Sequence, residues 1–406
     1  MISALVDGVK GGRWFSLIDK ISAPRTLAVA WAQVRSNRGA CGVDGQSVER
    51  FAARQEEYLA ELSQALGRAT YQPQAVRRVE IPKGDGRMRP LGIPTVEDRI
   101  VQTAIKLVIE PIFEAMFVPS SYGFRPGRGS KDALREVERL LGEGYVHVVD
   151  ADLRSYFDSI PHERLMARVE ARISDGRLLG LLRSYLAQDI FDGLQSWTPT
   201  GGTPQGAVIS PLLGNLYLHP LDVHLRDGGY KLVRYADDFV VLCRSREEAE
   251  AALAEVAGWV EANGLSLHPD KTHVGDCREP GQGFEFLGYR FEAGRRWVRK
   301  KSLDRLKDKV RDKTRRTRGD SLARVIDDLN PLLRGWFGYF KHAYHTTFTE
   351  VDGFVRRRLR AFLRKQEKRP GAGHCHDDHK RWPNAFFARD GLFALHTAWL
   401  AARDSR

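Results

Sequence analysis

The chain has 406 residues, 42% of them hydrophobic, and its 64 Lys and Arg against 52 Asp and Glu give a net charge of +12. This length is enough for two or three domains, and no apolar run is long enough to cross a bilayer. Four scattered cysteines without a CxxC pair indicate neither a disulfide framework nor a zinc ribbon. Because the N-terminus also lacks a signal-peptide pattern, we expect a cytoplasmic protein.

The predicted elements begin with helices. Apolar residues recur at helical spacing in residues 13–70, which are interrupted by the glycine-rich loop 37–45. Residues 71–145 alternate short β-like runs with helices, and residues 145–291 hold further strands around a helix at 246–263. Since strands and helices do not follow simple βαβ alternation, the sequence predicts an α+β fold rather than a doubly wound sheet.

Two of the predicted strand stretches carry acids at their ends. The β-like run 145–152 ends in Asp-Ala-Asp, and residues 231–243 are two apolar runs that meet at paired aspartates, Asp237 and Asp238. An Asp pair in a hairpin is by itself most often turn chemistry. Two acid-bearing strand ends, however, can supply the carboxylates from separate strands that a Mg²⁺ site needs.

The remaining predicted elements are helices and the loops before them. Residues 201–206 form a Gly- and Pro-rich loop that opens an apolar helical segment, 207–218. After about residue 299 the chain becomes helical, with basic amphipathic helices at 303–310 and 322–329. The pair Asn330-Pro331 then predicts the N-cap and first residue of another helix.

Positive charge is concentrated in these C-terminal helices. Residues 295–320 hold thirteen Lys or Arg against four Asp, and residues 356–369 hold eight against the single Glu367. A charge run is usually a solvated helix face, but an excess of cations on defined segments is also the electrostatic footprint of phosphate-backbone binding. The arginines expected to contact nucleic acid are Arg311, Arg315, Arg316, Arg356 and Arg357.

The order of these features resembles the palm of a reverse transcriptase: an acid-ending strand, Pro-Gln-Gly before a helix, then Tyr-Ala-Asp-Asp in a hairpin. Leu329 to Phe340 resembles the thumb/maturase domain of intron-encoded proteins, and the resemblance runs from about Leu17 to the C-terminus. The motifs that resemble group II intron reverse transcriptases are Arg77 to Lys83, Arg89 to Pro94, Ser121 to Gly127 and Phe284 to Tyr289.

This resemblance implies a right-hand polymerase. Its parts would be a helical N-terminal extension (1–70), fingers and palm (71–298), thumb/maturase helices (299–368) and a basic, DNA-binding tail (369–406). The implied function is RNA-directed DNA synthesis by the protein of a bacterial mobile group II intron, which also binds its intron RNA and assists splicing and retrohoming. Implied partners are intron RNA, an RNA template, a DNA primer or target and deoxynucleotides, with no membrane, for a monomer or dimer. Because no Cys-rich nuclease module follows, we expect no homing-endonuclease domain.

The resemblance also implies two Mg²⁺ ions, which would lower the pKa of the attacking hydroxyl and neutralise charge on the leaving pyrophosphate. Their implied ligands are Asp152, Asp237 and Asp238, with the Leu153 carbonyl as an additional one. The family's ligand is the first acid of an Asp-x-x-x-x-Phe pattern, which selects Asp152. Asp150 is the alternative, because two residues earlier on a strand it points to the same face.

Further site residues are implied in the same way. Phe157, five residues after the first metal ligand, matches the bulky residue that crowds the sugar 2′ position. Lys83 and Arg89 match the fingers residues that grip the incoming triphosphate, where Lys supplies a point charge and Arg a planar fork. Gln205 would sit against the nascent base pair, and Lys271 matches the lysine suited to protonate pyrophosphate. Without the resemblance, Phe157 would be interpreted as core and the cations as ordinary surface residues.

Other interpretations stay open at this point. The cluster from His374 to His379 invites a metal, although ligands this close in a polar loop cannot easily surround one ion. A domesticated, intron-less relative could act in DNA repair or phage defence. A non-catalytic RNA-binding splicing factor with an inactive palm is a third possibility, against which the three intact aspartates argue.

Overall fold

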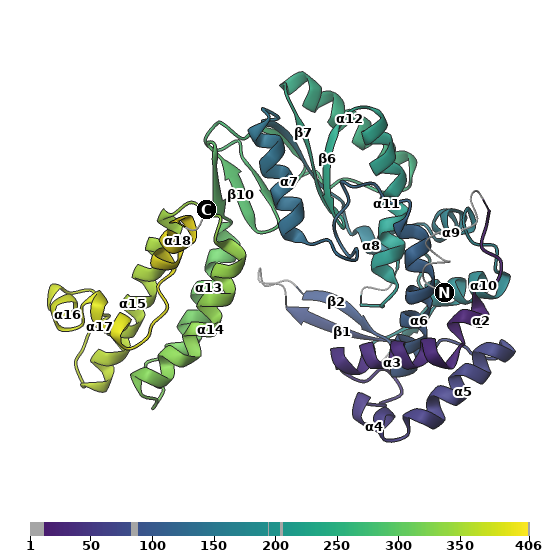
Figure 1. Ribbon diagram of the computed structural model, residues 1–406, viewed down its shortest axis with the longest axis horizontal. Coiled ribbons are helices and arrows are strands. Elements are labelled where there is room, and N and C mark those ends of the chain that lie inside the picture. Colours follow the sequence, from purple (N-terminus) through teal and green to yellow (C-terminus); the bar gives the residue numbers. More distant parts are fainter. Residues whose placement is uncertain (1–11, 83–87, 194, 204–205, 405–406) are drawn as a thin grey trace. The chain divides into compact units, whose positions relative to one another are not determined.

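The computed structural model describes residues 12–82, 88–193, 195–203 and 206–404 (Figure 1). The chain divides into a first compact unit, Met1–Val274, and a second, Gly275–Arg406. Separate sheets and numerous helices confirm the predicted α+β class. None of the helices in these described ranges has the length and apolar character of a membrane-spanning segment.

The first unit begins with helices α2 (Ile18–Ile21), α3 (Pro24–Asn37), α4 (Val48–Ala53) and α5 (Gln55–Arg68), which confirms the helical interpretation of residues 13–70. A proline in the first turn starts α3, and the Ser47 side chain caps α4. The rings of Trp31, Phe51 and Tyr58 pack at centroid distances of 4.6 and 5.1 Å. This aromatic core joins α3, α4 and α5.

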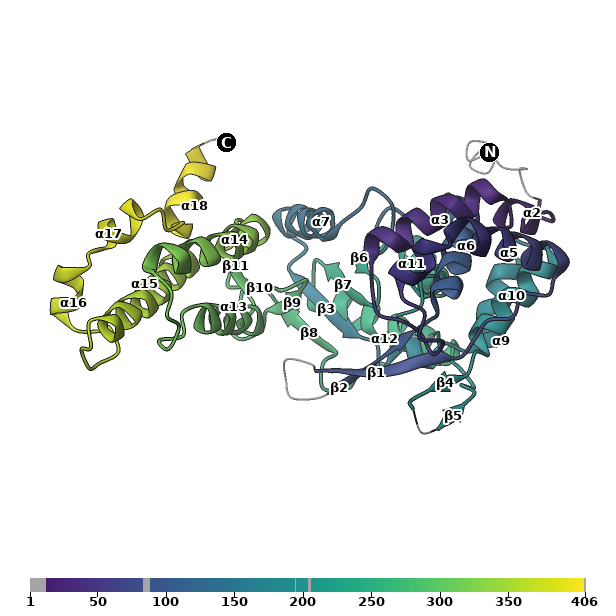
Figure 2. The same ribbon diagram turned by 90° about the horizontal axis from the view of Figure 1, so that it is seen from below.

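The first sheet has the strand order β2-β1-β4-β5 (Figure 2). Its strands are β1 (Val76–Pro82), β2 (Met88–Ile93), β4 (Ile190–Phe191) and β5 (Ser196–Trp197). β1 pairs antiparallel with β2 and parallel with β4, so two short strands from much later in the chain extend the β1–β2 hairpin. Helix α6 (Val96–Glu114) follows β2 directly and packs against α3.

The second sheet has the order β6-β7-β3-β8 and carries the acids. Its strands are β3 (His147–Asp152), β6 (Lys231–Tyr235), β7 (Asp238–Cys243) and β8 (His273–Asp276). Both β3 and β6 pair antiparallel with β7, and the central residues of β7 are fully buried. Helix α12 (Arg246–Ala262) packs on β3 and β7, whereas α7 (Ser130–Gly142) and α11 (Ser210–Asp227) contact β6 (Figure 1).

Three helices connect the two sheets: α8 (Tyr156–Ser159), α9 (His162–Glu170) and α10 (Gly176–Leu186). Asp175 caps α10 by accepting from the N–H groups of Arg177 and Leu178, and it also accepts from those of Leu17 and Ile18. Burial alone would raise the pKa of Asp175, but these four donors outweigh it and hold the pKa below its ordinary value. One carboxylate therefore fastens the N-terminal helices to the rest of the unit.

The second unit consists of the sheet β11-β10-β9 and the helices that follow it. The strands are β9 (Phe284–Phe286), β10 (Tyr289–Glu292) and β11 (Arg295–Val298), and the helices are α13 (Lys300–Lys313), α14 (Leu322–Phe340), α15 (Thr346–Gln366), α16 (His376–Arg381), α17 (Asn384–Arg389) and α18 (Leu395–Asp404). The Tyr289 and Phe340 rings lie 5.0 Å apart, and the Tyr339 hydroxyl donates to the Leu287 carbonyl. The sheet therefore packs on α14 within this unit.

The prediction that a helix starts at Asn330-Pro331 is wrong. α14 continues through Pro331, which lies inside the helix, and its buried apolar residues form one stripe on both sides of the proline. The Asn330 side chain does not cap a helix start. It donates to the Gly391 carbonyl at 2.9 Å and accepts from the Phe393 N–H at 2.8 Å.

Candidate active site

The acids of the two strand stretches meet in the second sheet. Asp152, the last residue of β3, lies directly opposite Asp238, the first residue of β7, and Tyr235 of β6 pairs with Asp238 from the other side. Directly opposite residues of an antiparallel pair point to the same face, so Asp152 and Asp238 share a face. Asp237 precedes Asp238 in the turn, after Ala236, whose φ of 61° is left-handed. We call residues 235–238 the aspartate turn.

Asp152 is held by the segment that follows α12. Its Oδ2 lies 2.7 Å from the Lys271 Nζ, with side chains 41% and 53% exposed. The Asp152 carbonyl accepts from the His268 N–H at 2.8 Å, and the buried Leu153 forms an isolated bridge with Leu267. The two hydrogen bonds of this bridge run from the His268 N–H to the Asp152 carbonyl and from the Arg154 N–H to the Ser266 carbonyl. The Leu153 carbonyl accepts neither of them.

The metal ligands that this turn can offer are carboxylate oxygens, which bind hard divalent cations such as Mg²⁺. Among the residues that the structure describes, no three His, Cys, Asp or Glu side chains stand in a metal-holding group, and the Lys271 ammonium supplies the positive charge beside Asp152. Asp150, the alternative ligand, lies opposite Val240 and is further from the turn. The register therefore favours Asp152 over Asp150.

Phe157 is half-buried and rests on α11. A Cβ atom at Gly214 would lie 3.0 Å from the Phe157 ring. The ring therefore fits closely against α11 because residue 214 has no side chain. Tyr156 contacts the same ring edge-on at 5.2 Å and donates from its hydroxyl to the Gly214 carbonyl at 2.6 Å. The Thr203 N–H donates to the Phe157 carbonyl at 2.6 Å. The ring is thus fixed by α11 and by the loop before it.

The structure describes only one of the other three residues expected to bind the nucleotide, Lys83, Arg89 and Gln205. Lys83 and Gln205 lie outside the described residues. Arg89 lies in β2, where its backbone is paired with Ile81 of β1. The roles of all three remain predictions.

The end of the Pro-Gln-Gly loop packs on the first sheet. Gly206 has a φ of 106°, and a Cβ atom there would lie 2.3 Å from the Gly92 carbonyl oxygen, so only glycine fits. The Gln102 side chain of α6 accepts from the Val208 N–H at 2.8 Å. This hydrogen bond holds the residues just before α11 against α6. Helix α11 begins at Ser210 rather than at the predicted residue 207.

The aspartate turn rests on a buried ion pair that the sequence analysis missed. Arg234 of β6 and Asp222 of α11 are both 0% exposed and are joined by two hydrogen bonds of 2.6 Å. The same guanidinium donates to Asn215 Oδ1 at 2.9 Å and to the Ala236 carbonyl at 2.8 Å. Burial lowers the pKa of Arg234, but the Asp222 carboxylate outweighs burial and raises it. A charged residue in an apolar strand, directly before Tyr-Ala-Asp-Asp, was the available signal.

The segment Ser121–Gly127, expected in the fingers, runs beside β6. The Tyr122 N–H donates to the Arg234 carbonyl at 2.8 Å. A Cβ atom at Gly123 would lie 2.3 Å from the Ala236 nitrogen, so this glycine lets the two backbones touch. The aspartate turn is therefore supported on one side by Arg234 and on another by Gly123.

Comparison with known proteins agrees with this arrangement. Residues 81–291 match the model of the family described as reverse transcriptase (RNA-dependent DNA polymerase), which spans just over half of the chain. The chain belongs to the reverse transcriptase family. Residues 303–382 match the group II intron maturase-specific domain, so this is a group II intron-type reverse transcriptase/maturase.

Several relatives and solved structures are similar to this reverse transcriptase. It is 37% identical over 315 residues to protein YkfC of Escherichia coli (strain K12), covering 68% of the chain and 82% of YkfC. It is 37% identical over 202 residues to the group II intron-encoded protein LtrA of Lactococcus lactis subsp. cremoris, covering 49% of the chain but only 33% of LtrA. Among solved structures, a partial Cas6-RT-Cas1–Cas2 complex has a TM-score of 0.39 at 27% identity, covering 61% of this chain and 42% of that one. Telomerase from Candida albicans has a TM-score of 0.44 at 12% identity, covering 84% and 67%.

In the second unit of the reverse transcriptase, several predicted nucleic-acid contacts gather around Phe354. The Arg311 and Arg357 guanidinium groups lie 5.4 and 5.1 Å from the centre of its ring. Burial, followed by the nearby charges of Arg357, Arg311 and Arg316, lowers the pKa of Arg358. The Nε of Arg316 is buried and has no hydrogen-bond partner within the described residues. We call these four arginines and Phe354 the Phe354 cluster.

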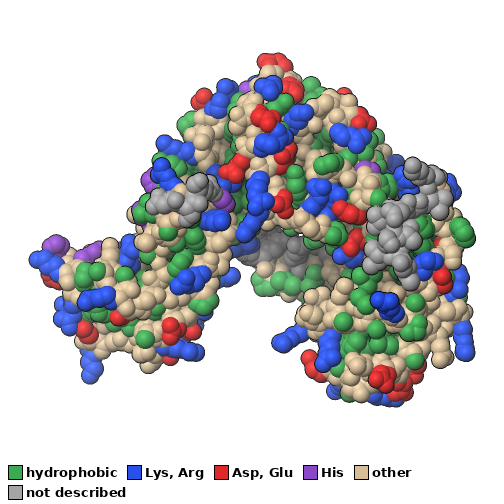
Figure 3. All heavy atoms as spheres, in the orientation of Figure 1, with side chains coloured by type: hydrophobic (Ala, Val, Ile, Leu, Met, Phe, Trp, Pro, Cys, Tyr) green, Lys and Arg blue, Asp and Glu red, His purple; other side chains and the backbone are tan. Residues whose placement is uncertain are grey.

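The other two predicted nucleic-acid contacts, Arg315 and Arg356, each have a carboxylate neighbour. Arg315 lies 2.8 Å from Asp312, and Arg356 is 19% exposed and 4.0 Å from Asp352. Arg311 also pairs with an acid, Asp308. Lys and Arg side chains are spread over the visible face of this unit (Figure 3).

The histidine-rich segment of the second unit faces arginines. His374 Nε2 lies 3.2 Å from Arg357. The buried Asp378 pairs with Arg364 at 2.6 Å, and the Cys375 sulfur lies 3.1 Å from the same guanidinium. The residues of this segment are therefore linked to α15 by charge-assisted hydrogen bonds.

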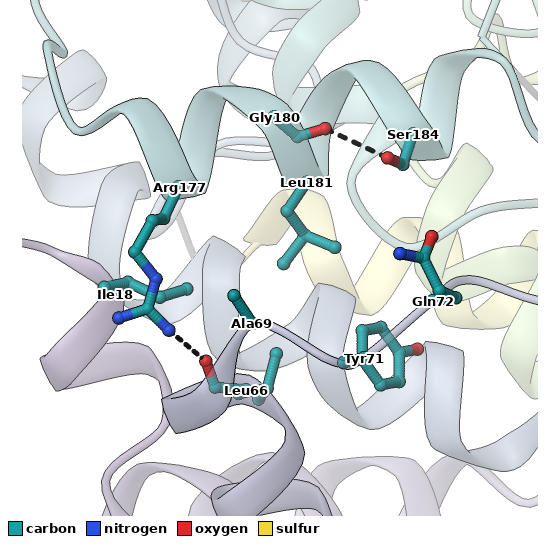
Figure 4. Close-up of a pocket in the computed structure, with 9 residues that line it drawn as sticks. All are labelled: Ile18, Leu66, Ala69, Tyr71, Gln72, Arg177, Gly180, Leu181 and Ser184. Carbon is teal, nitrogen blue, oxygen red and sulfur yellow. Dashed lines mark hydrogen bonds between the residues drawn. The ribbon is translucent and has the colours of Figure 1, made fainter.

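One cavity of the first unit lies away from the aspartate turn. Its volume is about 180 Å³, and its lining comes from α2, α5, the segment that follows α5, and α10 (Figure 4). Arg177 donates to the Leu66 carbonyl at its edge. Because none of the lining residues is acidic, this cavity holds no carboxylate for a metal. The lining residues are Ile18, Leu66, Ala69, Tyr71, Gln72, Arg177, Gly180, Leu181 and Ser184.

Replacing Asp222 by Leu should leave the buried Arg234 guanidinium without its carboxylate. We expect the free energy of unfolding to fall by about 3–5 kcal/mol, measured by urea unfolding. The double variant Asp222→Leu/Arg234→Met should recover most of this loss, because no unpaired charge remains. Its polymerase activity should stay low, since the bond to the Ala236 carbonyl is absent. If the single variant Asp222→Leu were as stable as the parent, Asp222 would not be the buried partner of the Arg234 charge.

Proposed function

We propose that the chain synthesises DNA on an RNA template for a mobile group II intron, whose RNA it binds and whose splicing and retrohoming it assists. The observation that carries the polymerase activity is the placement of Asp152 opposite Asp238, with Asp237 in the adjoining turn. The maturase-specific match at residues 303–382 supports the role in splicing. No observation on the described residues favours an intron-less role in repair or defence.

We infer that Asp152, Asp237 and Asp238 hold two Mg²⁺ ions, with the Leu153 carbonyl as a further ligand. When bound, such ions lower the pKa of the primer 3′-hydroxyl and neutralise charge on the leaving pyrophosphate. Lys271, 2.7 Å from Asp152, balances the charge of this carboxylate. Its position beside a metal-binding acid supports a role as the proton donor to the leaving pyrophosphate.

Nucleotide selection is assigned to the surface between α8, α11 and the first sheet. The Phe157 ring, fixed against Gly214, would exclude a sugar with a 2′-hydroxyl. Lys83 and Arg89 would bind the triphosphate, and Gln205 the nascent base pair. The contact of Gly206 with β2 supports this grouping, because it joins the loop of Gln205 to the strand of Arg89.

Binding of nucleic acid phosphates is assigned to the Phe354 cluster. Burial, and after it the charges of Arg357, Arg311 and Arg316, lower the pKa of Arg358, so positive charge is crowded around this guanidinium. A phosphate placed among them would relieve this repulsion and would release counterions from the nucleic acid. Arg315 and Arg356, which lie outside this cluster, are assigned weaker contacts.

Asp237→Asn should abolish extension of a DNA primer on an RNA template, because it removes a metal-binding charge and keeps the side-chain volume. We expect kcat to fall by about a hundredfold or more, with RNA binding and thermal stability unchanged. Asp227→Asn, the same change at an acid of the first unit whose side chain is 62% exposed, is the matched control. Parent-like extension by the Asp237 variant would refute the site assignment.

Phe157→Ala should admit ribonucleotides, because removal of the ring opens space beside the sugar. The measured quantity is the ratio of kcat/KM for ribonucleotide over deoxyribonucleotide, which should rise by about tenfold, or ~1.4 kcal/mol. Tyr156→Phe removes the bond to Gly214 but keeps both rings, and should leave the ratio near that of the parent. An unchanged ratio in the alanine variant would assign Phe157 to the core alone.

Replacing Arg311, Arg316 and Arg357 together by Gln should weaken RNA binding across unrelated sequences. The slope of log affinity against log salt should decrease by roughly 0.7 to 0.9 for each phosphate that the variant no longer neutralises. The control replaces Arg54, Arg135 and Arg246, three exposed arginines of the first unit, and therefore makes the same change in net charge. If both triple variants keep the parent slope, the phosphates are bound elsewhere.

A further inference from the structure

Phe124 combines two properties that are unfavourable for a phenylalanine. Its side chain is 49% exposed, and its backbone has a φ of 58°, in the left-handed region. Bulky residues rarely adopt this conformation, because the Cβ atom then crowds the backbone. Strained residues of this kind persist only where the surrounding structure imposes them, and they gather at functional sites.

Both neighbours of Phe124 are rigidly held. On one side, Gly123 touches the backbone of Ala236, and its carbonyl accepts from the Asn215 side chain at 2.7 Å. On the other side, Arg125 is 7% exposed and pairs with Glu114 at 2.6 Å. Its guanidinium also donates to two backbone carbonyls of the same segment, at 2.7 Å each. The chain is therefore anchored before and after Phe124, and the ring is left to project outward.

The ring lies beside the aspartate turn. Its centre is 6.4 Å from that of Tyr235, at an angle of 41°. Tyr235 pairs with Asp238 and precedes the two acids of the turn. The exposed Phe124 ring and the half-buried Tyr235 ring thus stand next to the residues assigned to metal binding. The Phe124 side chain itself offers neither a charge nor a metal ligand.

We propose that Phe124, together with Tyr235, forms an apolar surface that contacts the primer–template duplex next to its growing end. This inference rests on the proposed polymerase function. Sugars and base edges at the primer terminus must lie beside the aspartates during synthesis, and an aromatic face binds them without regard to sequence. The rigid frame of Gly123 and Arg125 holds the ring in place before the substrate arrives, which reduces the entropy lost on binding.

Phe124→Gly separates this role from a packing role, because the two predict opposite changes. Glycine accepts a left-handed backbone without strain, so the melting temperature should stay unchanged or rise. The Kd for a fluorescent DNA primer annealed to an RNA template should rise by about tenfold, measured by anisotropy. The kcat at saturating duplex should stay within about twofold of the parent value, and the salt slope of binding should not change, because no charge is removed.

Phe124→Trp and Phe15→Gly complete the experiment. The first keeps an aromatic face and should retain most of the duplex affinity. The second removes another exposed phenylalanine of the first unit, 79% exposed, and should leave affinity unchanged. A lower melting temperature with parent-like affinity in Phe124→Gly would overturn the proposal. An inactive parent would instead refute the polymerase function, while the effect of Phe124 on duplex binding would still be measurable.

Discussion

The ion pair between Arg234 and Asp222 joins β6 to α11 in a part of the first unit where both side chains are fully buried. A buried pair of this kind contributes little net stability, because desolvation of the two charges offsets much of their attraction. This ion pair is distinguished by the hydrogen bonds that the Arg234 guanidinium donates to groups other than Asp222. One guanidinium nitrogen bonds to both Asn215 and the Ala236 carbonyl, so the pair sets the backbone position directly before Asp237.

The walls of the site are assembled by close approaches that depend on missing side chains. Gly123 lets one segment touch the aspartate turn, Gly206 lets the Pro-Gln-Gly loop touch β2, and Gly214 makes room for the Phe157 ring. A Cβ atom at the first two positions would overlap backbone atoms, which cannot move aside as a flexible side chain can. Segments that are distant in the chain are thus held at backbone contact, Gly123 against the aspartate turn and Gly206 against β2.

The two units differ in the charge they offer to a nucleic acid. The aspartate turn in the first unit concentrates carboxylates, with Lys271 as a close cation. The Phe354 cluster in the second unit concentrates guanidinium groups, two of which lie over one aromatic ring. Carboxylates suit metal-assisted chemistry on a phosphate, whereas guanidinium groups suit retention of a phosphate backbone.

Local sequence patterns were enough to predict the strands, the hairpin with Asp237 and Asp238, the acid-ending run before it and the basic helices. These features are local: hydrophobic period, turn residues and charge runs act within a few residues of one another. The same local patterns carried the family resemblance. They failed at Pro331, where packing of a continuous apolar stripe kept the helix intact despite a strong local signal to begin a new one.

Which distant groups meet became visible in the folded chain alone. Tertiary structure set the register that places Asp152, rather than Asp150, opposite Asp238, and it brought Lys271 to Asp152. It also paired Arg234 with Asp222 and left Phe124 exposed beside Tyr235. The physical reason is that the free energy of each of these contacts depends on burial and on a partner from another element. A single strand or turn contains neither, so no local pattern can encode them.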